Sequence, residues 1–176
     1  MRFLALFVFM VNVAFAQNFY AVKDKAINGN SYKMDELKGK VVMVVNLASQ
    51  CGFTPQIEKL EELYKRYRAK NFVVLGAPTN DFGGQTPEDD KGFQAFCDKN
   101  YHVSFPLLVK QTVTGPKKRD LYKYLTEQTA KEFQGPIKWN FEKFLIDKNG
   151  KVVGRFESSV DPLDKKITKK IEELTK

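Results

Sequence analysis

The chain has 176 residues, of which 43% are hydrophobic and 28% charged, and its 29 Lys and Arg outweigh 21 Asp and Glu to give a net charge of +8. This length predicts one domain of ordinary size with a sizeable core. The basic residues are scattered, and no basic cluster is interleaved with stacking aromatic residues, so the composition argues against a nucleic-acid partner. A general attraction to acidic surfaces stays open.

The amino terminus has the pattern of a secretory signal. Met1-Arg2 supplies a positive start, residues 3–13 form an apolar run, and Ala14-Phe15-Ala16 is a small-x-small cleavage site. The run is shorter than the ~20 residues that span a bilayer, and no other segment is long enough. We therefore predict a cleaved signal peptide at 1–16, a mature domain at 17–176, and a secreted or periplasmic protein without stable membrane insertion.

The first half of the mature chain alternates buried strands with amphipathic helices. The β-branched run at 41–47 predicts a strand covered on both faces. Thr54 and Pro55 favour the start of a helix reaching about residue 70, with Thr54 capping its free amides. Three further elements are expected in chain order: a strand at 72–75 closed by Gly76 and Pro78, a loop at 79–87, and a helix from 87 to about 100.

The second half predicts a hairpin between two helices. Pro106 suits a short edge strand at 105–109, and Asn149-Gly150 is a tight hairpin turn. The last helix places Lys165, Lys166, Lys169 and Lys170 opposite Ile167, Ile171 and Leu174, as expected of a solvated face. Four elements complete the order: a helix from 118 to about 128, strands at 141–146 and 152–156, and the helix at 162–174. This order predicts a three-layer α/β domain.

Cys51 lies where the strand at 41–47 gives way to the following helix. A thiol just ahead of a helix N-terminus feels unpaired N–H donors and the positive end of the helix dipole, and both favour the thiolate, which is the reactive form. The alternative is a small buried hydrophobic residue, as free Cys often is. The flanking turn favours a reactive thiol.

Two cysteines in a secreted chain normally indicate one structural disulfide, so a bridge between Cys51 and Cys97 is one alternative. The sequence has no Cys-x-x-Cys pair, because Thr54 stands where the second cysteine of a thioredoxin-type couple would be. The single histidine, His102, excludes multi-histidine metal sites and weakens a Cys–His protease interpretation. We expect His102 to be a surface or half-buried packing residue.

Three segments of the mature chain carry its most specific patterns. The first is Asn46-Leu47-Ala48-Ser49-Gln50-Cys51-Gly52-Phe53-Thr54. The others are Asn80-Asp81-Phe82-Gly83-Gly84-Gln85 and Trp139-Asn140-Phe141-Glu142-Lys143-Phe144-Leu145. In order and spacing, the three segments resemble those of one family, the glutathione peroxidases, over essentially the whole mature chain, and the first is similar to the family's active-cysteine segment. The fold of this family is thioredoxin-like. The resemblance implies a thioredoxin-like fold with a central mixed β-sheet flanked by helices.

The resemblance also implies an active tetrad of Cys51, Gln85, Trp139 and Asn140. The Cys51 thiolate would attack a peroxide oxygen, while the two amides and the indole N–H hold the thiolate and then the developing oxyanion. Each residue has a structural alternative. Gln85 could brace a Gly-Gly turn, Asn140 could cap the start of a strand, and Trp139 could be a core anchor.

Cys97 is the candidate resolving thiol, because thioredoxin-dependent members of the family carry a second cysteine in the matching segment. The expected sulfenic acid of Cys51 would condense with it. On the apolar face of a helix, Cys97 would reach Cys51 only after local unwinding, so a buried inert cysteine is the alternative.

Departures from the family pattern bear on oligomeric state and reductant. The chain is short between Gly115 and Trp139, where tetrameric members carry an extra loop, so it resembles the monomeric type, whose open site admits bulky lipid hydroperoxides. The basic residues that hold glutathione in animal enzymes have no clear counterparts. The family's frequent extra cysteine is also missing, and Thr79 stands at its position.

We therefore predict a thiol peroxidase with an antioxidant role in oxidative stress, which reduces hydrogen peroxide and organic or lipid hydroperoxides. A thioredoxin-like protein or glutathione would reduce it again, and no metal or organic cofactor is implied. Two alternatives stay open. One is a peroxide sensor that relays a disulfide to a partner protein, and the other is a non-catalytic thioredoxin-fold binding protein with a structural disulfide.

Overall fold

The computed structural model describes residues 18–176, and the predicted signal peptide at 1–16 lies outside the described residues. The described part is built around a four-stranded mixed sheet with the strand order β4-β3-β5-β6. In residues 18–176, no helix has the length and apolar character needed to cross a membrane.

The central sheet contains one parallel and two antiparallel strand pairs. Its strands are β3 (Val41–Leu47), β4 (Phe72–Pro78), β5 (Lys143–Ile146) and β6 (Val152–Phe156). β3 runs parallel to β4, with Val41 opposite Phe72, whereas β5 is antiparallel to both β3 and β6. A separate two-stranded ribbon pairs β1 (Asp24–Lys25) with β2 (Ser31–Tyr32). The predicted strand at 41–47 and the predicted hairpin are therefore confirmed.

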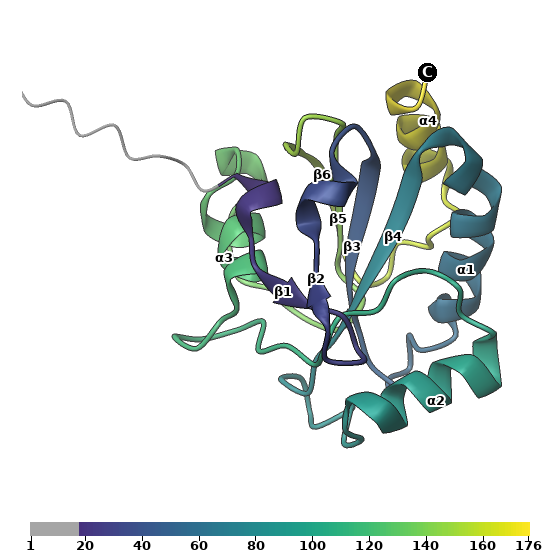
Figure 1. Cartoon of the computed structure of the whole chain (residues 1–176), viewed down its shortest axis with the longest axis vertical. Helices are drawn as coiled ribbons and strands as arrows, with labels where there is room; N and C mark the ends of the chain where they lie inside the picture. Colours follow the sequence, from purple (N-terminus) through teal and green to yellow (C-terminus); the bar gives the residue numbers. More distant parts are fainter. Residues whose placement is uncertain (1–17) are drawn as a thin grey trace, which may run out of the picture.

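Helices cover both faces of this sheet, as Figure 1 shows with α1 and α4 on one side and α3 on the other. The helices are α1 (Gln56–Tyr67), α2 (Asp90–Tyr101), α3 (Asp120–Glu127) and α4 (Lys165–Leu174). Short 3-10 turns lie at Phe19–Ala21, Met34–Leu37, Arg68–Lys70 and Lys131–Phe133. This arrangement is the three-layer α/β/α architecture that the order of elements predicts.

Strand β3 supplies both halves of the core, because successive side chains of a strand point to opposite faces. Val41, Met43 and Val45 pack with α1, α2 and α4, in the half of the core that also contains Cys51 and Cys97. Val42 and Val44 pack with α3 and the first residues of the described chain. All seven residues of β3 are buried, which explains why its sequence is continuously apolar up to Asn46.

Two predictions about strand β4 and its neighbour are wrong. The strand does not end at Gly76 but continues to Pro78. Glycine is needed at position 76 because a Cβ atom there would lie within 2.7 Å of the Leu47 and Leu107 side chains. The glycine thus allows close packing and does not break the strand. The segment at 105–109 forms isolated bridges through Leu107 and Leu108, not a regular strand.

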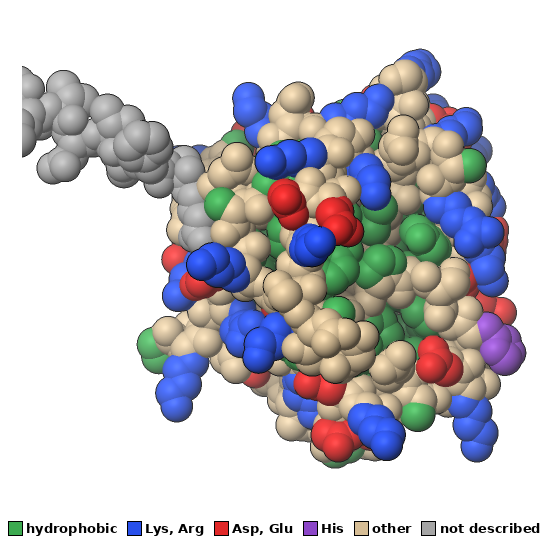
Figure 2. All heavy atoms as spheres, in the orientation of Figure 1, with side chains coloured by type: hydrophobic (Ala, Val, Ile, Leu, Met, Phe, Trp, Pro, Cys, Tyr) green, Lys and Arg blue, Asp and Glu red, His purple; other side chains and the backbone are tan. Residues whose placement is uncertain are grey.

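The basic surface residues are dispersed on the face that Figure 2 shows, where Lys and Arg side chains alternate with acidic and uncharged ones. On α4, Ile167 and Ile171 are fully buried, while Lys165, Lys166 and Lys169 are exposed. The lysines of this helix therefore form a solvated face, as the sequence indicates.

Candidate active site

Cys51 lies in the turn that joins the carboxyl end of β3 to the start of α1. Thr54 organises this turn, because its Oγ1 accepts a hydrogen bond from the Cys51 amide at 3.0 Å and donates one to the Ala48 carbonyl at 2.9 Å. The prediction that Thr54 caps the helix is wrong. Pro55 occupies the N-cap position without a side-chain cap, and Thr54 reaches back toward the strand.

The sulfur of Cys51 is nearly enclosed and receives a backbone donor. The residue is 7% exposed, and the amide of Phe53 donates to its Sγ with an N–S distance of 3.5 Å. The contact therefore places a backbone N–H donor directly against the sulfur. Cys51 and Cys97 are both free, so the structure does not contain the permanent disulfide considered above.

The loop carrying Gln85 is bonded to the chain just ahead of Cys51. The backbone amide of Gln50 donates to the Gln85 carbonyl at 3.0 Å. The hydroxyl of Ser49 donates to the Glu88 carboxylate at 2.7 Å. Gly83 and Gly84 both adopt positive φ values, which lets the chain turn sharply ahead of Gln85. The loop is therefore held against the segment that carries the thiol.

Asn140 meets Gln85 directly. Its Nδ2 donates to the Gln85 Oε1 at 3.0 Å, across 55 positions of sequence, and Asn140 itself is fully buried. This bond uses the acceptor of the Gln85 amide and leaves its NH2 group free to donate elsewhere. The alternative in which Asn140 caps a strand is not what the structure shows, because the amide is directed at Gln85.

Trp139 is the large hydrophobic side chain that stands out as exposed among residues 18–176, with 39% of its surface accessible. Its ring lies against Phe82 at a centroid distance of 5.6 Å, on the loop that leads to Gln85. The alternative of a core anchor is therefore wrong. An exposed indole beside this loop can present its N–H to a substrate.

Asn46 holds the Trp139 segment in place, a role that the sequence analysis missed. Its Nδ2 donates to the Trp139 carbonyl at 3.0 Å, and its own carbonyl accepts from the Phe141 amide at 2.7 Å. Phe141 adopts a φ of 68°, a left-handed conformation that costs a bulky residue about 1–3 kcal/mol. The sequence signal for this role is a single polar residue, Asn46, within an otherwise apolar strand. The structure shows that Asn46 is fully buried.

The structure thus bonds two of the four predicted tetrad residues, Gln85 and Asn140, to each other, and it bonds the Gln85 backbone to the residue before Cys51. Gln85 is joined to the backbone beside Cys51 and to the Asn140 side chain. Trp139 is connected through Asn46, five positions before the thiol. In the part of the chain that is described, no group of three or more His, Cys, Asp or Glu side chains is arranged to hold a metal ion.

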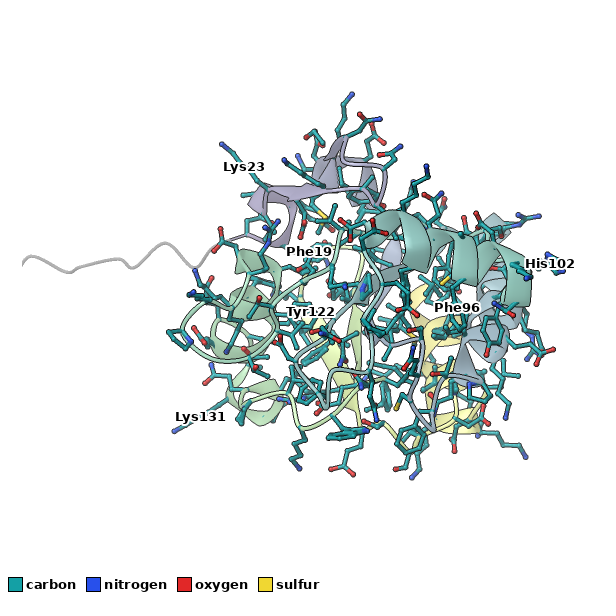
Figure 3. The ribbon with its side chains drawn as sticks, turned by 90° about the horizontal axis from the view of Figure 1, so that it is seen from below. Phe19, Lys23, Phe96, His102, Tyr122 and Lys131 are labelled. Carbon is teal, nitrogen blue, oxygen red and sulfur yellow. The ribbon has the colours of Figure 1, made fainter. Side chains whose placement is uncertain are left out.

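Cys97 is fully buried on the inner face of α2. Burial, together with the charges of Asp98 and Glu88, raises the pKa of its thiol from 9.0 to about 12. Figure 3 shows Phe96 on the same helix and His102 at its end. His102 is exposed and ends the helix in a left-handed conformation, with a φ of 49°. A thiol in this setting favours its protonated form, which is the less reactive one.

Comparison with known proteins places this fold in one class. A solved thiol:disulfide interchange protein of the thioredoxin family from Chlorobium tepidum TLS superposes with a TM-score of 0.65 at 18% identity, over 91% of this chain and 98% of the other. The crystal structure of T. cruzi GPX1 superposes with a TM-score of 0.70 at 30% identity, over 90% and 97% of the two chains. The domain therefore has the thioredoxin fold.

The family follows from the sequence matches. The family model for glutathione peroxidase matches residues 19–126. Glutathione peroxidase-like peroxiredoxin 2 of Saccharomyces cerevisiae is 53% identical over 154 residues, which are 85% of this chain and 94% of the relative. The chain belongs to the glutathione peroxidase family, and it is a thiol peroxidase, an oxidoreductase that reduces peroxides.

Proposed function

We propose that Cys51 is the peroxide-reacting thiolate and that Gln85, Trp139 and Asn140 polarise the peroxide. The observation that carries this proposal is the hydrogen bond between the Asn140 and Gln85 amides, together with the bond from the Gln50 amide to the Gln85 carbonyl. These contacts link side-chain amides from two distant segments to the chain next to the turn that holds the thiol. Preorganised donors of this kind stabilise charge that develops during reaction.

The first chemical step transfers one oxygen to sulfur. The Cys51 thiolate attacks one peroxide oxygen, the O–O bond breaks, and the departing oxygen takes up a proton to leave as water or an alcohol. Sulfur is oxidised by two electrons to a sulfenic acid, and the peroxide is reduced by two. Hydrogen-bond donors on Gln85, Asn140 and Trp139 would stabilise the departing oxyanion, by about 2–4 kcal/mol each.

The second step closes a disulfide with Cys97. The Cys97 sulfur attacks the sulfenic sulfur, an S–S bond forms, and water leaves. Because Cys97 is fully buried in α2, this step requires the helix to unwind locally. A thioredoxin-like dithiol then reduces the disulfide by exchange, and glutathione is the alternative reductant.

The signal-like pattern of residues 1–16 and the short connection between Gly115 and Trp139 support our proposals on compartment and assembly. The family match begins at residue 19, just after the expected cleavage site at Ala16, which fits a removable signal peptide and a secreted or periplasmic enzyme. The short connection from α3 to Trp139 lacks the loop of the tetrameric type. We therefore propose a monomer that accepts hydrogen peroxide and bulky lipid hydroperoxides.

Substitution of each cysteine separates the two steps. We expect Cys51→Ser to abolish peroxide turnover with both thioredoxin and glutathione, because the nucleophile is gone. Cys97→Ser should lose thioredoxin-supported turnover and retain a single round of oxidation. Peroxide consumption, measured with and without reductant, distinguishes these cases. Full thioredoxin turnover by the Cys97 variant would exclude Cys97 from the mechanism.

A further inference from the structure

Lys143 is a fully buried lysine next to the candidate active site that the proposed mechanism does not use. It lies in β5 opposite Val45 of β3. Its Nζ donates to the Phe141 carbonyl at 2.9 Å, to the Ser158 carbonyl at 3.3 Å and to the Glu157 carbonyl at 3.5 Å. An ammonium group has three N–H donors, so these three backbone oxygens match its full hydrogen-bonding capacity.

These contacts join two segments that flank the site. Phe141 follows directly on Trp139 and Asn140, and it adopts the left-handed φ of 68°. The Ser158 carbonyl also accepts a hydrogen bond from Gln56 Nε2 at 2.7 Å. Gln56 is the first residue of α1, the helix that follows Cys51. Lys143 and Gln56 therefore tie the Trp139–Phe141 segment to the base of that helix through one shared carbonyl.

We propose that Lys143 is a positioning residue for the peroxidase reaction, which aims the Asn140 amide at Gln85 by holding the Phe141 carbonyl against the Glu157–Ser158 turn. The Phe141 amide is already bonded to Asn46, so the peptide units on both sides of Phe141 are fixed. Without Lys143, the carbonyl side of this unfavourable conformation loses its partner. The Asn140–Gln85 contact then loosens, although no catalytic group has been removed.

The experiment measures oxidation of Cys51 by hydrogen peroxide in a single turnover of Lys143→Met. Burial lowers the pKa of Lys143 to about 7, and replacing a buried charged side chain by an apolar one of similar length is often tolerated by a fold. We expect the second-order rate constant to fall about 10- to 100-fold, as for other misplaced catalytic groups. Reduction of the oxidised enzyme by thioredoxin should be unaffected.

Lys118→Met is the matched control. Lys118 is also largely buried, with Nζ bonded to Thr126 and Glu127, but it lies at α3 away from the site. Its variant should react within about twofold of the wild type. If Lys143→Met also reacts within about twofold of the wild type, Lys143 has no positioning role.

A double-mutant cycle with Asn140→Ala distinguishes positioning from a general structural effect. If Lys143 acts through Asn140, the double variant should oxidise no more slowly than Asn140→Ala alone. Rate losses that multiply would overturn the inference. The inference rests on the proposed role of Asn140, and the two can fail separately, because an unchanged rate in Asn140→Ala alone contradicts that role directly.

A second variant keeps the test decisive if Lys143→Met does not fold. Gln56→Leu removes the other donor to the Ser158 carbonyl at a half-exposed helix start. It should slow oxidation about threefold or more, again without multiplying the loss in Asn140→Ala. If Lys143→Met does not fold and Gln56→Leu reacts at the wild-type rate, the proposed link from the Ser158 carbonyl to Asn140 is wrong.

Discussion

Thr54 shows how one hydroxyl can organise a reactive turn. It accepts from the amide of Cys51 and donates to the carbonyl of Ala48, and all three residues are buried. A threonine thus bridges the end of β3 and the thiol at a position where the sequence suggests only a helix cap. The hydroxyl fixes the direction in which the chain leaves the strand, and hence where the sulfur lies.

Thr54→Val should destabilise the protein because it keeps the shape of the side chain but removes both hydrogen bonds. The Cys51 amide and the Ala48 carbonyl would be left unpaired in the core, at a cost of about 2 kcal/mol in the free energy of unfolding. Urea denaturation followed by circular dichroism measures this loss.

Thr168→Val is the comparison for this substitution. Thr168 is similarly buried, but its hydroxyl makes only a helical back-bond to the Asp164 carbonyl. Such a bond contributes little to a helix, so a change below about 0.5 kcal/mol is expected. Equal stability losses in the two variants would mean that the Thr54 bridge has no special importance.

At the scale of elements, helix α2 buries the thiol of Cys97 in the core. Folding keeps Cys97 protonated, since the pKa of its thiol is about 12 in the folded protein against 9.0 for a free thiol. Below pH 9, both folded and unfolded chains hold the proton, and burial of the thiol contributes fully to stability. Between pH 9 and 12 the unfolded chain ionises first, so that stability is lost as the pH rises.

We expect this loss to be visible as a difference between the wild type and Cys97→Ala under reducing conditions. From pH 8 to 10, the wild type should lose about 1 kcal/mol more of its free energy of unfolding than the variant. The cavity left by alanine lowers stability at every pH and cancels in the comparison. Parallel curves would indicate that Cys97 ionises in the folded protein as readily as in the unfolded chain.

The elements that the sequence predicts well are those with local causes. Strand β3 was predicted over its full extent because a run covered on both faces must be apolar throughout. The prediction that Gly76 closes strand β4 was wrong, because glycine is required there by the side chains of Leu47 and Leu107, which are distant in sequence. The segment at 105–109 was misjudged for a similar reason, since its bridges depend on Gly76 and Ala26.

The site was predictable in its parts but not in its connections. The three motifs identify Cys51, Gln85 and Asn140, yet only the fold shows that the Gln85 and Asn140 side chains are bonded to each other. The role of Asn46 depends on its side-chain bond to the carbonyl of Trp139, 93 positions away. The role of Lys143 depends on its side-chain bond to the carbonyl of Ser158, 15 positions away. No local pattern encodes such contacts.

At the scale of the whole molecule, the sequence pattern at residues 1–16 predicts a cleaved signal peptide. Expression in a secretion-competent host should give a mature protein that starts at Gln17, because Ala14 and Ala16 suit a signal peptidase. The mass of the intact purified protein measures this directly. An Ala16→Asp variant, whose cleavage should be blocked, provides the control, and wild-type protein that keeps residues 1–16 would contradict the prediction.

Trp139 is the sole tryptophan of the chain, and it stands partly exposed on the segment that also carries Asn140. Its ring rests on Phe82 and its carbonyl is bonded to Asn46. All indole emission from this protein therefore originates on the segment that carries Asn140. If Trp139 lies beside the reacting sulfur as proposed, we expect oxidation of Cys51 to change this emission, so that the reaction can be followed optically in the unlabelled enzyme.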